Sequence, residues 1–258
     1  MGLLIVVQDN RRLYIFIFVS LFFVMPVLSI FIGAYQLSPL KVIEVIVNSL
    51  SASHKDYNES IILFDIRIPR IVLAMLVGFA VSVSSATFQA TFRNPLVSEY
   101  ILGLSSGAAF GASISIAFFG DSLPVQPFAF IFGILAVFMS YLMSKIKGET
   151  TVLSLVLSGI ITTAIFTAGN YIIRYIVEPE KLQGIIVWLM GSLSSASWND
   201  VSWSCPWIIV GSFFLILLRW RLNVLSMGDE EARALGLDVA RLKIIFIVLA
   251  TVITASAP

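Results

Sequence analysis

Two arginines stand three residues apart in the segment Arg67-Ile-Pro-Arg70. Residues at this spacing share one face of a helix, and Pro69 suits a first helical turn, where its missing N–H breaks no hydrogen bond. Guanidinium groups bind carboxylates through paired hydrogen bonds. The pair is therefore a candidate docking site for acidic groups of an external partner. The alternative is that both side chains extend along apolar surface toward a membrane interface.

A second polar segment, residues 226–241, predicts two short helices. Asp229 is expected to be the N-cap of the first helix, two glutamates follow it in the first turn, and Gly236 is expected to end this helix. Asp238 is expected to cap the second. A rigid pair of helices between two apolar runs is a candidate docking element for a cytoplasmic partner, and an ordinary amphipathic loop is the alternative.

Few other residues suit chemistry. The chain has one histidine, His54, and one cysteine, Cys205, which excludes an internal disulfide, a cysteine-rich metal cluster, most zinc sites and most histidine-based catalysis. Gly103, Gly107 and Gly111 follow no predicted strand and precede no lysine, so they predict close helix packing rather than a phosphate-binding loop. The sequence therefore predicts no catalytic residue, no metal site and no cofactor.

The composition indicates the kind of fold that must position these residues. Of 258 residues, 59% are hydrophobic and 12% are charged, about half the charged share of a soluble domain, and the mean hydropathy is +0.99. The net charge of +1 gives no reason to expect a nucleic-acid partner. These values exclude a disordered chain and argue against a water-soluble enzyme. They predict an all-α, polytopic bundle of membrane-spanning helices.

Apolar runs near the length of about 20 residues that a bilayer requires predict seven spans. They cover residues 13–35, 71–92, 100–119, 125–143, 152–176 and 203–218, and a seventh begins at residue 244. The run at 182–190 is too short to cross and is expected to form a surface or re-entrant helix. The first run exceeds the apolar region of a signal peptide and has no evident cleavage site, so we interpret it as a true span.

The charged residues predict the orientation of these spans. With the N-terminus in the cytoplasm, ten of the sixteen lysines and arginines lie on the inner side. Arg67 and Arg70 are then expected at the outer mouth of the second span, and residues 226–241 on the cytoplasmic face. No carboxylate lies in the middle of a predicted span, whereas ion-coupled transporters usually contain one.

The last apolar run holds 15 residues, from Ile244 to Pro258, or about 22 Å of helix. This length is short of a full crossing. We expect a chain that is truncated within its last helix, and a short or tilted helix is the alternative.

Five motifs, taken together and in this order, resemble the permease family of ABC importers for iron–siderophores, haem and vitamin B12. They are Arg67-Ile-Pro-Arg70, Phe88-Gln-Ala-Thr-Phe-Arg-Asn-Pro-Leu96, Leu102-Gly-Leu-Ser-Ser-Gly-Ala108, Trp188-Leu-Met-Gly-Ser-Leu193 and Gly228-Asp-Glu-Glu-Ala-Arg-Ala-Leu-Gly236. The resemblance runs from about Ile66 to the end and departs mildly at residues 97–100. It implies that residues 1–258 form one permease domain with about seven of the family's ten helices, incomplete at the C-terminus.

The resemblance also implies partners and roles for individual residues. Family members work in the cell membrane as homodimers or heterodimers, with cytoplasmic ATP-binding subunits and an external or periplasmic substrate-binding protein. Docking of the binding protein is implied for Arg67 and Arg70. Coupling to the ATPase, through helices within residues 226–241, is implied for Gly228, Asp229, Glu231, Ala232, Arg233, Leu235 and Gly236. Lining of the translocation path is implied for Ser158, Gly159, Thr162 and Thr163.

The implied function is import of metal chelates, most simply ferric siderophores, by a subunit that is not itself an enzyme. Import of haem or cobalamin, an inactive truncated fragment, and a secondary transporter are alternatives. An intramembrane protease is disfavoured, because His54 falls in an outer loop where no buried Ser–His pair can form.

Overall fold

The computed structural model describes residues 11–33, 35–50, 57–95, 97–146, 149–150, 152–191, 193–194 and 196–256. His54 lies outside the described residues. The chain divides into two compact units. Unit 1 comprises residues 1–75 with 194–198, and unit 2 comprises residues 76–193 with 199–258. The described part of the chain is almost entirely helical, which confirms the predicted all-α class.

Unit 1 contains the first span and the segment that leads into the second. Its elements are α2 (Arg11–Phe31), α3 (Pro39–Leu50), α4 (Tyr57–Ile61), the wide π-helical turn η1 (Ile62–Arg67) and the start of α5 (Ile68–Phe92). Its small core is formed by Leu37, Val42, Val45 and Leu63. The apolar runs of the sequence did not predict α3.

The second span begins earlier than the sequence predicted. Helical structure is continuous from Asn58 to Phe92, over 35 residues, instead of starting near residue 71. Pro69 therefore lies inside a helix, where a proline removes one amide donor and crowds the preceding turn. The wide turn η1 directly before it shifts the pairing by one residue, since the Ile68 N–H donates to the Leu63 carbonyl. This turn lets the helix continue through the proline.

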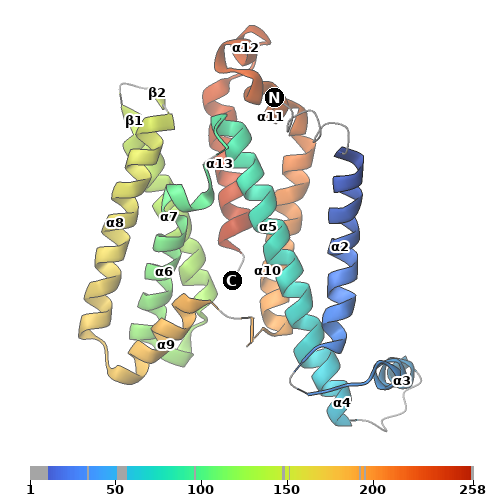
Figure 1. Cartoon of the computed structure of the whole chain (residues 1–258). Coiled ribbons are helices and arrows are strands. Elements are labelled where there is room, and N and C mark those ends of the chain that lie inside the picture. Colours follow the sequence, from blue (N-terminus) through green and yellow to red (C-terminus); the bar gives the residue numbers. More distant parts are fainter. Residues whose placement is uncertain are drawn as a thin grey trace, which may run out of the picture. The chain divides into compact units, whose positions relative to one another are not determined.

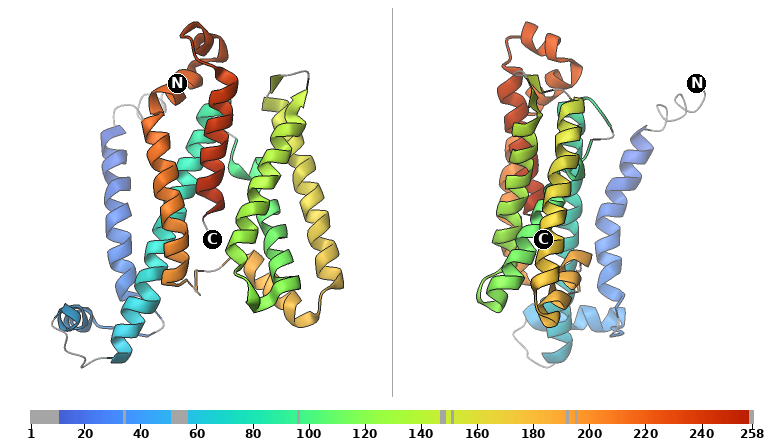
Figure 2. Two further views of the ribbon diagram at one scale, coloured as in Figure 1. Left: turned by 180° about the vertical axis from the view of Figure 1, so that it is seen from behind. Right: turned by 90° about the vertical axis from the view of Figure 1, so that its left-hand side faces the viewer.

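Unit 2 holds the remaining helices. In chain order they are η2 (Glu99–Leu102), α6 (Leu104–Ile114), η3 (Ser115–Phe119), η4 (Gly120–Ser122), α7 (Val125–Ser144), α8 (Val152–Ile176), α9 (Pro179–Met190), α10 (Trp198–Leu217), α11 (Arg219–Met227), α12 (Asp229–Ala234) and α13 (Val239–Ala255). The strands β1 (Lys145–Ile146) and β2 (Glu149–Thr150) form a two-residue antiparallel ladder between α7 and α8. Helices α6, α7 and α8 lie side by side (Figures 1 and 2).

Glycines allow α6 and α7 to approach closely. A Cβ atom at Gly107 would lie 2.5 Å from the carbonyl oxygen of Phe132, and one at Gly111 would lie 2.3 Å from that of Phe128. Both distances are too short for any larger residue. The predicted role of these glycines in helix packing is therefore confirmed.

The seven predicted apolar runs all form helices among the described residues. Five helices are long and apolar enough to cross a bilayer, Leu104–Phe119 is shorter, and α13 begins at Val239 and covers 17 residues. The short apolar run at 182–190 is helical as expected, within α9. At most a third of each long span's most apolar window is buried inside the chain. The apolar side chains that remain exposed suit contact with lipid.

Candidate docking, path and coupling sites

Arg67 is held inside unit 1. Its guanidinium donates hydrogen bonds to the carbonyl oxygens of Ile30, at 2.5 Å, and Tyr35. Only 7% of the residue is exposed. Ile30 lies in the last turn of α2, where backbone carbonyls have no partner within the helix. Arg67 therefore caps the end of α2 and fixes the chain that follows it, a role that the sequence did not indicate.

Arg70 lies one turn further along and has a different partner. Its Nη2 atom donates to the carbonyl oxygen of Ser194 at 2.5 Å, while its buried Nε has no hydrogen-bond partner. The indole N–H of Trp198 donates to the Phe64 carbonyl at 2.9 Å and ties the same segment to η1. The two arginines thus share a helix but not a binding surface, and Arg70 is the more accessible of the two.

The four residues implied for the translocation path lie together on α8. Ser158, Gly159 and Thr162 are buried, and Thr163 is partly exposed. A Cβ atom at Gly159 would lie 1.7 Å from the carbonyl oxygen of Ile101 in η2. This contact, between backbone and backbone, marks a seam between α8 and η2, which we call the α8 seam.

Gly103 extends the α8 seam toward α6. Its φ of 77° is in the left-handed region, where a side chain is strained. A Cβ atom there would lie 3.2 Å from Cγ2 of Thr162 and 3.3 Å from Oγ1 of Thr163. Gly103 and the two threonines, 59 and 60 residues further along the chain, therefore form one contact.

Polar atoms occupy this packed region. The Ser158 hydroxyl donates to the Ser154 carbonyl at 2.7 Å, within α8, whereas the buried Oγ1 of Thr162 has no partner. Further along α8, the buried Asn170 accepts a 2.6 Å hydrogen bond from Ser113 of α6. This pair was not predicted from the sequence. An asparagine within an apolar run was the available signal, because such residues commonly bind across helices in membranes.

Asp229 differs from its predicted role. It is the first residue of α12, and Gly228 occupies the N-cap position without a side-chain cap. The Asp229 carboxylate instead accepts from Lys243 Nζ of α13 at 2.6 Å and faces Arg93 Nη2 at 3.5 Å. The prediction of an N-cap was therefore wrong, because two cations distant in sequence attract the carboxylate more strongly than a local amide does.

Arg93 enters this contact from the end of α5. Its φ of 50° is left-handed, which is unusual for a residue with a side chain. The following amide, of Asn94, donates to the Gln89 carbonyl at 3.2 Å and closes the helix. Arg93, Asp229 and Lys243 thus connect α12 with α5 and α13, and we call them the charged clamp.

The C-terminal end of α12 agrees with the prediction. Gly236 has a φ of 78°, and its N–H donates to the Arg233 carbonyl at 2.9 Å. The Leu237 N–H donates to the Ala232 carbonyl at 3.0 Å, which completes a Schellman motif. Asp238 caps a helix as expected, accepting from the Arg241 N–H at 3.1 Å, but that helix is the long α13 and not a second short one.

One residue of α12 is buried, whereas others around the helix are exposed. Ala232 packs with α11 and α13 in the core of the unit. Glu231, Arg233 and Leu235 are exposed. A short helix that is fixed by a buried residue and displays charged and apolar side chains around it is suited to dock into another protein.

Among the described residues, no group of three or more histidine, cysteine, aspartate or glutamate side chains could hold a metal ion. The three regions described above are a capped helix end, a packed seam and a charged clamp. Their chemistry is that of helix positioning rather than bond making or breaking.

Comparison with known proteins gives consistent similarities. Residues 21–258 match the model of the FecCD transport family. A probable iron chelatin transport system permease protein of Helicobacter pylori is 38% identical over 239 residues, which cover 91% of this chain and 72% of that protein. The molybdate import system permease protein MolB of Haemophilus influenzae is 35% identical, over 93% of this chain and 72% of its own length. A solved inward-facing structure of a metal-chelate type ABC transporter is 31% identical, with a TM-score of 0.79, over 95% of this chain and 75% of that one.

Proposed function

Since the chain belongs to the FecCD transport family and is a permease of an ABC importer for iron chelates or related substrates, we propose that its cargo is a ferric siderophore. The similarity to an iron chelatin permease, at 38% identity, carries the proposal. The chain is also 35% identical to a molybdate permease, so the identity of the cargo must be tested by experiment.

The proposed importer places the chain between two kinds of partner. An external substrate-binding protein delivers the chelate, cytoplasmic ATP-binding subunits hydrolyse ATP, and a second permease subunit completes the membrane part. The N-terminus lies in the cytoplasm, as the positive charges favour. α5 then runs from the docking side, near Arg70, to the coupling side, where Arg93 ends it.

On the outer side, we propose that Arg70 contacts a carboxylate of the binding protein and that Arg67 holds the surface that presents it. The support is the difference in burial and bonding between the two. Arg67 uses its guanidinium on two carbonyls of its own unit, whereas Arg70 keeps an Nε donor without a partner.

Arg70→Glu tests the docking proposal. It is expected to abolish binding of the substrate-binding protein without loss of membrane insertion, because it turns an attraction between opposite charges into repulsion. Arg67→Lys is the matched variant and is expected to retain binding, since a lysine still donates to a helix end. Wild-type binding by Arg70→Glu would refute the docking role.

In the membrane, we propose that Ser158, Gly159, Thr162 and Thr163 line the path when the α8 seam opens. Their support is chemical, since small and hydroxylated side chains present a polar surface without bulk. Three of the four are buried against neighbouring helices in the present structure. Contact with cargo therefore requires α8 to move away from η2.

On the inner side, we propose that α12 docks into the ATP-binding subunit through its exposed face. Glu231, Arg233 and Leu235 would contact the partner, and the remaining residues of the motif shape the helix. Gly228 begins it, Gly236 ends it, and Ala232 packs it onto α11 and α13. Asp229 would pass the movement to α5 and α13 through the charged clamp.

Uptake by cells tests the cargo. Cells that lack the gene, and the same cells with the gene restored, are given a ferric siderophore, haem, cobalamin or molybdate, each with a radioactive label. We expect the gene to be needed for the siderophore alone, and uptake to persist when a protonophore collapses the proton gradient while ATP is kept high. Restoration of another cargo would refute the siderophore proposal, and loss of uptake with the protonophore would favour a secondary transporter.

A further inference from the structure

Helix α3 has two apolar faces, and only one of them is buried. Val42 and Val45 pack with Leu37 and Leu63 in the core of unit 1. On another side, Leu40 is 80%, Ile43 57% and Val47 53% exposed. Residues at 40, 43 and 47 follow the spacing that places side chains on one helical face. α3 therefore displays a continuous apolar strip away from the core of its own unit.

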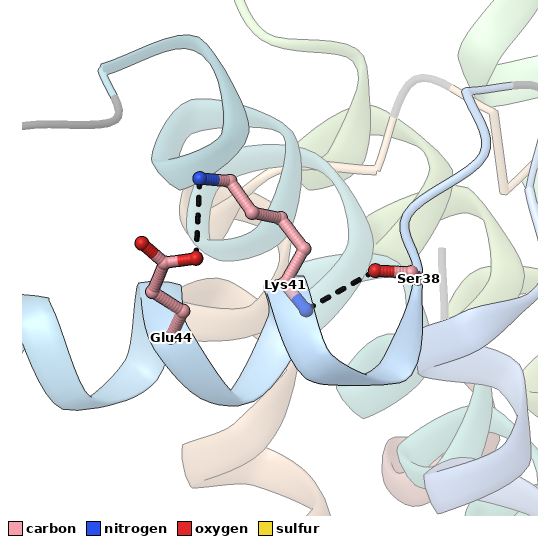
Figure 3. A network of polar contacts seen from close by, with 3 residues as sticks. All are labelled: Ser38, Lys41 and Glu44. Carbon is pink, nitrogen blue, oxygen red and sulfur yellow. Dashed lines mark hydrogen bonds and ion pairs between the residues drawn. The ribbon is translucent and has the colours of Figure 1, made fainter.

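A polar strip runs beside this exposed face. Ser38 accepts a hydrogen bond from the Lys41 N–H at 3.3 Å and so caps the start of α3, and Lys41 Nζ pairs with Glu44 Oε2 at 3.4 Å (Figure 3). The two charges lie one turn apart on the same side of the helix. α3 thus has the division into an apolar and a charged face that is typical of helices at a membrane surface.

The chain brings α3 to the end of a spanning helix. α2 is a candidate span, and none of its most apolar window is buried inside the chain. Seven residues separate Phe31, at its end, from Pro39, at the start of α3. Arg67 binds the carbonyl of Ile30, in the last turn of α2, and that of Tyr35, within this link. The start of α3 is therefore held close to the level at which α2 leaves the hydrocarbon.

The direction of α3 agrees with this position. Where α2 is seen along its length, α3 is seen nearly end-on (Figure 1), and in the view turned by 90° α3 lies flat (Figure 2). α3 therefore runs across α2. A helix that crosses the axis of a spanning helix at its end runs along the membrane plane.

We propose that α3 is an interfacial helix whose face of Leu40, Ile43 and Val47 inserts into the boundary between lipid headgroups and acyl chains. The lipid surface is the occupant because α3 crosses α2, in the same unit, at the end of this candidate span. The strip of Lys41 and Glu44 then faces the headgroups and water. This anchor sets the depth of the adjoining α2 end and of Arg67. It goes beyond the proposed cargo and does not depend on it.

Depth-dependent fluorescence quenching tests the proposal on the full chain. In a Cys205→Ser background, single cysteines replace Ile43, Val47 or Glu44 and carry an environment-sensitive dye. The purified permease is placed in phosphatidylcholine vesicles with nitroxides at shallow or deep acyl positions. Phe23→Cys, at an exposed position within α2, is the control for the hydrocarbon interior.

We expect dyes at 43 and 47 to show blue-shifted emission and to lose more fluorescence to the shallow nitroxide than to the deep one. The dye at Glu44 is expected to be quenched by aqueous iodide, and the dye at 23 chiefly by the deep nitroxide. Iodide quenching of 43 and 47 without nitroxide quenching would overturn the proposal. A blue shift that appears only after addition of a substrate-binding protein, or only with self-association, would also overturn it, because a protein would then cover this face.

Discussion

Gly159→Ala is expected to destabilise the chain, because its added methyl group has no space in the α8 seam. The new Cβ atom would lie 1.7 Å from the Ile101 carbonyl oxygen, while such atoms essentially never approach within 3.0 Å. α8 and η2 must then separate by at least about 1.3 Å, since a backbone oxygen cannot rotate away. Overpacking of this kind lowers the free energy of unfolding by about 3 kcal/mol. The higher helix propensity of alanine raises it again by up to about 1 kcal/mol. The expected net loss of about 2 kcal/mol corresponds to a fall of about 4–8 °C in Tm.

The measurement is the apparent Tm of purified protein in detergent, followed by the fluorescence of its five tryptophans. Gly78→Ala is the matched control, because Gly78 is also within a long helix but a Cβ atom there meets nothing within 4 Å. The control is expected to leave Tm unchanged or to raise it. If Gly159→Ala unfolds at or above the temperature of the wild type, α8 and η2 do not make this contact and the reasoning fails.

Three further substitutions test other contacts. Gly236→Ala is expected to lower stability by about 1 kcal/mol, seen as a lower apparent Tm, because alanine is strained at a φ of 78°. Asp229→Asn is expected to weaken the charged clamp and to lower cargo transported per ATP hydrolysed in the reconstituted importer, whereas Asp238→Asn, in an exposed local ion pair, should leave that ratio unchanged. Arg67→Ala is expected to cost roughly 2–3 kcal/mol, because two carbonyls lose a charged donor, and to expose the link after α2 to proteolysis; an unchanged cleavage pattern would contradict its capping role.

The spans and the glycine contacts were predictable because each depends on a local requirement. A bilayer demands a minimum length of apolar helix, and every predicted run contains a helix. Gly236 ends α12 because its backbone conformation excludes larger residues, and this preference is visible in one sequence. Gly107 and Gly111 were predictable for a similar reason. A residue without a side chain allows close approach of a neighbouring helix, whichever helix that is.

The start of the second span was not predictable in the same way. Charged residues near Pro69 suggested a helix that begins there, outside the hydrocarbon. Arg67 is instead buried, because it finds carbonyl acceptors 32 and 37 residues earlier in the chain. Asp229 was misjudged for the same reason, since its partner Lys243 belongs to a different helix. Partners so distant in sequence cannot be inferred from spacing alone.

The α8 residues show a different limit of sequence reasoning. Small and hydroxylated side chains suit both a polar path and a close helix contact, so residue types alone do not distinguish the two uses. A polar path and a close helix contact are compatible here. The Ser158 hydrogen bond stays within α8, and the buried Thr162 hydroxyl makes no hydrogen bond that opening of the seam would break. η2 is held by α7 instead, through a 2.8 Å hydrogen bond from Ser140 to the Leu102 carbonyl.

Separation of α8 from η2 would therefore sacrifice packing but no hydrogen bond of Ser158 or Thr162. A polar tie of α8 to α6 is the bond between Asn170 and Ser113, eight residues beyond Thr162, or about 12 Å along the helix. We expect α8 to pivot near this tie, so that the α8 seam opens while the Asn170 end stays in place. An alternating-access cycle needs such an element, with one end that stays fixed while the other end moves.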